Sequence, residues 1–178
     1  ALFREHSREE LQSDLDFTAE VFGKAVNGFM NENLRELRKV LTAVEEKKIH
    51  LKQVKRVGTL GVTQLDHDIA VEKGLYYYQG NDFASEIIFS IRRLAEPMKD
   101  HIDNNFSPLS PVQKDDFGKV SEQIISFLRN CATMIRKNDY IGFEELIAES
   151  ITLMNQLTAL KKGELKRIQG QSGSTKVS

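Results

Sequence analysis

The sequence predicts an all-α protein, folded as an antiparallel up-down bundle of about five long helices. Apolar residues recur at spacings of three and four along most of the 178 residues, which is the period of a helix face. The chain has only three prolines, and two of them lie in one short segment. A strand-rich fold would need turn signals every ~8–12 residues, and these are missing.

The first two predicted helices meet at an asparagine-rich corner. Ser7 can cap the first helix in a capping box with Glu10, and the apolar face that follows is Leu11, Leu15, Thr18, Phe22, Ala25 and Phe29. Asparagine is a weak helix former, so Asn31 and Asn33 mark the corner. The second helix then presents Leu34, Leu37, Leu41 and Val44 on one face. Because the connection is short, we expect antiparallel neighbours.

The second helix continues into a basic amphipathic segment, residues 45–56. Its cations include Lys47, Lys48, Lys52, Lys55 and Arg56. Such a segment either binds an anionic membrane surface or forms a solvated helix face. Base-stacking aromatic residues are absent from it and the net charge of the chain is -1, so we do not expect nucleic acid as a partner. The helix is expected to end between Val57 and Asp66, where Gly58 and Gly61 weaken it.

The third helix is predicted to be one long rod. It is expected to begin at a cap on Asp66 or Asp68 and to continue through Gly74 and Gly80. Its apolar face is Ile87, Ile91, Leu94, Met98 and Ile102. Pro97 removes one backbone hydrogen bond and is expected to bend the rod.

The same helix carries the densest group of polar residues in the chain. Glu96 and Asp100 are four residues apart, so both carboxylates project from one side of the helix, and His101 follows directly. Two ionised carboxylates at this spacing repel each other, and they need a solvated setting or a positive partner. Arg92, four residues before Glu96, is one candidate partner and a divalent cation is the other. The residues alone leave both open.

A turn-rich segment, residues 104–111, separates the third helix from the fourth. Ser110 is the predicted N-cap of the fourth helix with Pro111 at its first position, and the apolar face is Phe117, Val120, Ile124, Leu128, Cys131 and Ile135. After a tight corner at residues 137–139, the fifth helix is predicted to bury Phe143, Ile147, Ile151, Met154 and Leu157. We expect one domain over residues 1–168 and a flexible tail over residues 169–178.

Composition narrows the class of protein. The chain has no run of eighteen apolar residues, and its one cysteine, Cys131, cannot form an internal disulfide, which fits a reducing compartment. It starts at Ala1 without a methionine, so we expect a piece of a longer protein. No gathered nucleophile and no glycine-rich phosphate loop are visible, so an enzyme is not expected.

The order of the helices and the run LAEPMKDHIDNNFSPLS at residues 94–110 resemble a known family. This is the PhoU-like domain at the cytoplasmic C-terminal end of bacterial sodium/phosphate cotransporter family proteins. In that family a three-helix unit ends on the pattern Glu-x-x-x-Asp, often followed by His, whose carboxylates bind metal ions. The resemblance implies that Glu96, Asp100 and His101 hold a divalent or ferric metal ion, such as zinc or iron.

The resemblance also implies a function. It indicates a non-catalytic regulatory domain on the cytoplasmic side of the inner membrane, partnered by a membrane transporter domain in the same or a partner chain. Two alternatives stay open: a metal-binding domain or enzyme that uses the Glu96/Asp100 pair, and a helical oligomerisation scaffold. A homodimer and a peripheral contact with the membrane are further partner hypotheses.

Overall fold

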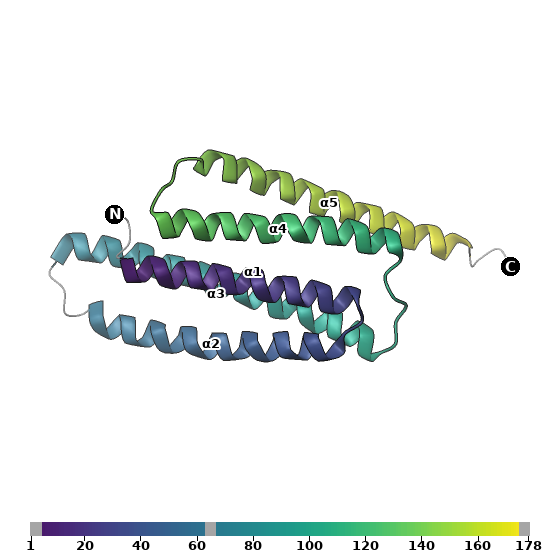
Figure 1. Cartoon of the computed structure of the whole chain (residues 1–178), viewed down its shortest axis with the longest axis horizontal. Coiled ribbons are helices and arrows are strands. Elements are labelled where there is room, and N and C mark those ends of the chain that lie inside the picture. The colour runs from purple at the N-terminus through teal and green to yellow at the C-terminus, as the bar shows by residue number, and fades with distance from the viewer. Residues whose placement is uncertain (1–4, 63–66, 175–178) are drawn as a thin grey trace.

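The computed structural model describes residues 5–62 and 67–174, and the side chains of residues 8–55 and 78–170 within them. These ranges hold five helices and no strand: α1 (Glu5–Met30), α2 (Leu34–Val62), α3 (His67–Asp103), α4 (Pro111–Lys137) and α5 (Phe143–Ser174). Successive helices run in opposite directions (Figure 1). The predicted all-α up-down bundle is confirmed.

The helices form a three-helix unit with a two-helix hairpin laid against it. Helix α1 packs on both α2 and α3, and α2 and α3 pack on each other. Helix α4 also packs on α1, and α5 lies on the outside of α4 (Figure 1). Within the described part of the chain, α5 contacts α4 alone. Helix α5 is therefore an outer layer that is supported from one side.

The hydrophobic core lies in the three-helix unit. The predicted α1 stripe is buried at Leu11, Thr18, Phe22 and Ala25, and the α2 stripe at Leu37 and Val44. On α3 the innermost line is Ala84, Ile88, Ile91, Ala95 and Met98. The predicted Ile87, Leu94 and Ile102 flank that line and are half-buried. The small alanines on this line, each four residues from an isoleucine, let α3 approach its neighbours, and the predicted apolar face did not include them.

Two glycines allow close helix approach. A Cβ atom added at Gly80 on α3 would lie 3.3 Å from Cδ1 of Leu11 on α1, and one added at Gly23 on α1 would lie 3.2 Å from Cδ1 of Ile125 on α4. Helix α3 is unbroken at Gly80 and also across Pro97, as the sequence predicted for one long rod. Gly80 is thus a packing residue within the helix.

The predicted corners are confirmed in detail. Ser110 caps α4, its hydroxyl accepts from the Gln113 amide, and the Gln113 side chain accepts from the Ser110 amide, with Pro111 at the first position. The Asn33 side chain accepts from the Glu36 amide at 3.1 Å at the start of α2. Asn138 ends α4 in the left-handed conformation, with φ of 52°. Asparagine tolerates this conformation better than most residues do.

Helix ends differ from prediction by a few residues. Helix α1 begins at Glu5, before the expected cap at Ser7, whose side chain lies outside the described residues. The expected cap Asp66 lies outside them as well, while the backbone of Asp68 is already inside α3. Helix α5 continues through Ser174, past residue 169 where a flexible tail was expected. Glycine weakens a helix without forbidding it.

The largest departure concerns the apolar face of α5, which was predicted to be buried. The side chains are exposed by 52% at Phe143, 40% at Ile147, 56% at Ile151, 65% at Met154 and 40% at Leu157. The residue of α5 buried against α4 is Leu153, at 7% exposure. The prediction of burial is wrong because α4 covers a neighbouring face of α5, and no other described helix reaches the stripe.

Candidate functional site

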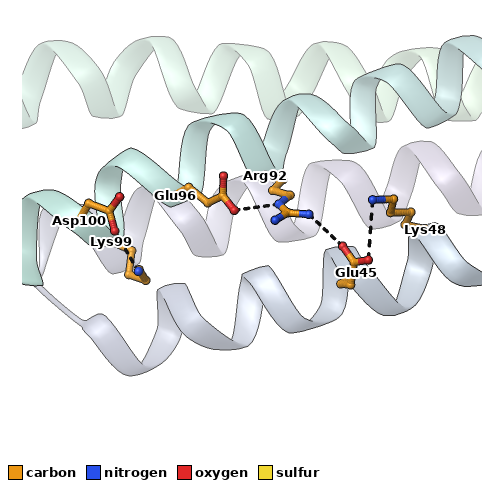
Figure 2. A network of polar contacts seen from close by, with 6 residues as sticks. All are labelled: Glu45, Lys48, Arg92, Glu96, Lys99 and Asp100. Atoms are coloured by element: carbon orange, nitrogen blue, oxygen red, sulfur yellow. Dashed lines mark hydrogen bonds and ion pairs between the residues drawn. The ribbon is translucent and has the colours of Figure 1, made fainter.

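The carboxylate of Glu96 on α3 belongs to a network of ion pairs that joins α3 to α2. The Nε atom of Arg92 donates to Oε1 of Glu96 at 2.8 Å. Nη1 of the same arginine lies 3.2 Å from Oε2 of Glu45 on α2, and Glu45 in turn lies 3.7 Å from Nζ of Lys48 (Figure 2). Arg92 is therefore the positive partner that its spacing from Glu96 allowed. The carboxyl groups of Glu96 and Glu45 raise the pKa of the Arg92 guanidinium.

Asp100 lies one turn further along α3 and pairs with a different cation. Nζ of Lys99 is 2.9 Å from Oδ1 of Asp100 and 3.8 Å from Oδ2 of Asp103. Asp103 is also 3.6 Å from Nη2 of Arg38 on α2. The hydrogen bond to Asp100 raises the pKa of the Lys99 ammonium. A second cross-helix bridge thus lies near the corner where α3 ends.

We name these residues the α2–α3 charge belt: Arg38, Glu45, Lys48, Arg92, Glu96, Lys99, Asp100 and Asp103. Most of its side chains are a quarter to nearly two-thirds exposed, as shown by Lys99 at 28% and Arg38 at 63%. Ion pairs at such exposure are screened by water and salt, so they add little to stability. The belt is a surface feature of alternating charge, held in place by two helices.

His101 points into a corner away from the belt. Its Nε2 atom donates to the carbonyl oxygen of Ser107 at 2.9 Å, since a carbonyl can only accept. The ring lies between those of Phe29 and Phe106, with centroids 5.4 Å away in each case. His101 therefore ties the α3–α4 connection to the end of α1.

The three residues predicted as metal ligands do not converge. Glu96 pairs with Arg92, Asp100 pairs with Lys99, and His101 bonds to a backbone carbonyl. Across residues 8–55 and 78–170, no three His, Cys, Asp or Glu side chains gather as a group that could hold a metal ion. Metal binding by Glu96, Asp100 and His101 therefore stays a prediction, and the arrangement of these three side chains does not support it.

A buried ion pair inside the three-helix unit was missed by the sequence analysis. Asp14 on α1 is 3% exposed, and its Oδ1 lies 2.6 Å from Nζ of Lys47 on α2. The pair borders a cavity of about 230 Å³ that His50 and Asn81 also line. Burial raises the pKa of the Asp14 carboxyl above its usual range, and the hydrogen bond from Lys47 opposes that rise. One signal was available, since Asp14 falls three residues after Leu11 on the apolar face.

The basic segment of α2 is largely tied to its own neighbours. Lys47 pairs with Asp14, the ammonium of Lys48 lies 5.0 Å from the ring centroid of Phe89, and Lys55 lies 2.6 Å from Asp82. These contacts make the segment part of the three-helix packing. Contact with an anionic membrane stays a prediction, and Arg56 has its side chain outside the described residues.

Comparison with known proteins identifies no relative of this chain. No protein-family model, no curated protein and no solved structure matches the chain. Of the helices in the described residues, none is long and apolar enough to cross a membrane. The resemblance at residues 94–110 therefore stands on the order of the helices and that run of residues.

Proposed function

We propose that this protein is a non-catalytic regulatory domain that binds the cytoplasmic side of a phosphate transporter through the α2–α3 charge belt. The observation that carries the proposal is the position of the belt. Arg92 reaches from α3 to α2, and the belt overlaps the segment, residues 94–110, on which the resemblance to transporter-attached PhoU-like domains rests.

The chemistry of the belt favours recognition of another protein. Alternating charges at fixed positions select a partner with the opposite pattern, and they disfavour partners with like charge. The cross-helix pairs of Arg92 with Glu45 and of Arg38 with Asp103 fix the pattern in space. Partial exposure leaves the charges available at the rim of an interface, where they act mainly on specificity and association rate.

The same geometry does not favour catalysis. A general acid or base needs a setting that tunes its pKa, such as burial or a like-charged neighbour. The side chains of Glu96 and Asp100 are 46% and 60% exposed, and each already has a cation beside it.

The proposal is tested by phosphate uptake in cells that contain the transporter and the intact protein. Arg92→Ala combined with Glu96→Ala should alter the regulation of uptake as much as loss of residues 1–168 does. The matched control is Lys119→Ala with Asp115→Ala, another exposed pair four residues apart, on α4. Control cells should behave as wild type. Uptake and regulation that are unchanged by loss of residues 1–168 would overturn the proposal.

Elemental analysis of the purified protein tests the competing metal hypothesis. Stoichiometric iron, zinc or manganese that is lost in both Glu96→Ala and Asp100→Ala would establish a metal centre at these residues. The proposed function would then become that of a metal-responsive regulator. Protein free of metal, with unchanged helicity in both variants, would leave the belt as a surface of ion pairs.

A further inference from the structure

The outer face of α5 is an apolar stripe that no helix of the described residues covers. Its members are between 40% and 65% exposed: Phe143, Ile147, Ile151, Met154, Leu157 and Leu165. At about 3.6 residues per turn they fall within roughly one third of the helix circumference, and they extend over about 33 Å of its length. Ser150 and Lys161 lie on the same face between these apolar residues. An exposed, mainly apolar stripe of this length usually marks a contact surface.

The charges of α5 are divided between its two halves. Residues 143–158 contain Glu144, Glu145 and Glu149 and no basic residue, so this half carries a net charge of -3. Residues 159–170 carry a net charge of +3, from Lys161, Lys162, Lys166 and Arg167 against Glu164. This order also suits the helix dipole, but the dipole acts only within the first and last turns. Lys161 and Lys162 lie well before the end of α5 at Ser174.

We propose that two copies of this chain pair through the outer faces of α5, antiparallel about a two-fold axis between Asn155 and Gln156. In this arrangement the acidic half of each α5 lies beside the basic half of the other. A parallel pair would place acid beside acid and base beside base. One surface serves both copies, as two-fold symmetry requires. The inference does not rest on the proposed function.

The register of this pair is defined by the charges. An axis at that point places Glu144 within one residue of the level of Lys166 of the second copy. It also places Glu144 level with Arg167, which pairs with Glu164 in its own copy. The same axis sets Met154 level with Leu157 and Phe143 level with Ile168, so exposed apolar residues of α5 meet across the pair.

The flanks of the stripe are consistent with this pairing. Lys162 follows Glu144 by about five full turns, and Lys166 by about six, so all three lie on one flank of the stripe. In an antiparallel pair each flank faces the same flank of the other helix, which brings Glu144 of one copy near Lys166 of the other. One helix face is small beside the ~800 Å² per partner of a standard interface, so the pairing should be reversible.

Sedimentation of the full chain tests the pairing. At micromolar concentration we expect a species of twice the 20.3 kDa mass, with the monomer appearing on dilution. Ile151→Asp and Met154→Asp should each weaken the pair at least tenfold. Because both positions are exposed, the circular dichroism of the monomer should not change. The matched control is Phe83→Asp, which alters a 68% exposed residue on α3 and should leave the pair intact. A wild-type chain that stays monomeric, or an Ile151→Asp variant that pairs as tightly as wild type, would overturn the proposal.

Cysteine cross-linking tests the antiparallel direction. In a Cys131→Ala background, Ile147→Cys and Leu165→Cys chains are mixed and oxidised. Antiparallel pairing brings these two positions together, so the cross-linked product should join one variant to the other. Positions 147 of two antiparallel copies lie about 25 Å apart, which is too far for a disulfide. Products that join only identical variants would overturn the antiparallel arrangement.

Discussion

The three-helix unit and the α4–α5 hairpin are built from apolar stripes of similar regularity, yet they bury them to very different extents. Ile88 on α3 is 1% exposed and Ile151 on α5 is 56% exposed, although both lie on stripes with helical spacing. The unit surrounds its stripes with two or three helices, whereas α5 has α4 alone. Helical periodicity therefore identifies a face, and the number of neighbouring helices decides whether that face is buried.

Ion pairs show the same contrast between the two regions. Lys47 and Asp14 in the unit, and Lys119 and Asp115 on α4, are each 2.6 Å apart. The side chains of the first pair are 16% and 4% exposed, and those of the second are 69% and 61% exposed. Equal distances therefore correspond to unequal energies, because only the first pair is removed from water.

The largest effect should come from the same substitution made in each region. Ile88→Ala should lower the free energy of unfolding by roughly 2–5 kcal/mol, since it leaves a cavity in the core. Ile151→Ala should change it by less than about 0.5 kcal/mol in dilute solution, where α5 is unpaired. Urea denaturation at low protein concentration measures both. Similar losses in the two variants would show that α5 is covered in the monomer and would remove the contrast.

Removal of one carboxylate from each ion pair should give the next largest effect. Asp14→Ala leaves the ammonium of Lys47 nearly buried without its partner, which should cost about 2–4 kcal/mol. Asp115→Ala should leave the urea midpoint unchanged, because water solvates Lys119 at once. The comparison is made under identical salt conditions. An equal shift of the midpoint in the two variants would contradict the assignment of Asp14 and Lys47 as a buried pair.

A smaller effect is expected at the cap that begins the hairpin. Ser110→Ala removes the hydroxyl that accepts from the Gln113 amide, and should cost about 1 kcal/mol. Ser126→Ala is the control, since Ser126 is exposed within α4 and alanine is the better helix former. Thermal unfolding should show a lower midpoint for the first variant only. Equal midpoints would mean that α4 does not depend on its capping box.

The sequence was sufficient for the features that depend on neighbouring residues in the chain. The N-cap of α4 at Ser110, with Pro111 after it, is a local feature that the sequence predicted. The i,i+4 pair of Arg92 with Glu96 is also local, and it was one of the two partners that the sequence left open for Glu96. Features that need a second helix were not predicted. The bridge from Arg92 to Glu45 spans 47 positions in the chain, and no spacing rule connects such residues.

Burial was predictable only where the bundle surrounds a helix. The stripes of α1 and α2 were assigned correctly because each of these helices has at least two neighbours. The stripe of α5 was assigned correctly as apolar and wrongly as buried. Asp14 is the opposite case, a buried residue for which no prediction was made, because acidic residues are usually exposed unless a partner such as Lys47 pairs with them.

The smallest expected effect is a dependence of stability on pH. It distinguishes the effect of burial on Asp14 from the effect of its ion pair with Lys47. Burial raises the pKa of this carboxyl, Glu10 raises it further, and Lys47 and His50 oppose the rise. A raised pKa in the folded state means that folding favours the protonated acid. The contribution of Asp14 to stability is therefore fully present below its unfolded pKa, and is lost as pH rises through its folded pKa.

As pH falls from 7 to about 4, wild type should gain unfolding free energy relative to Asp14→Asn, which cannot titrate at this position. Urea denaturation of both proteins across this range measures the difference in their unfolding free energy. The other carboxylates titrate in both proteins, so their contributions cancel in this difference. A difference that moves the opposite way would show that attraction to Lys47 outweighs burial. The pair would then stabilise the three-helix unit as an ion pair at neutral pH, and the contrast with Asp115 would become larger.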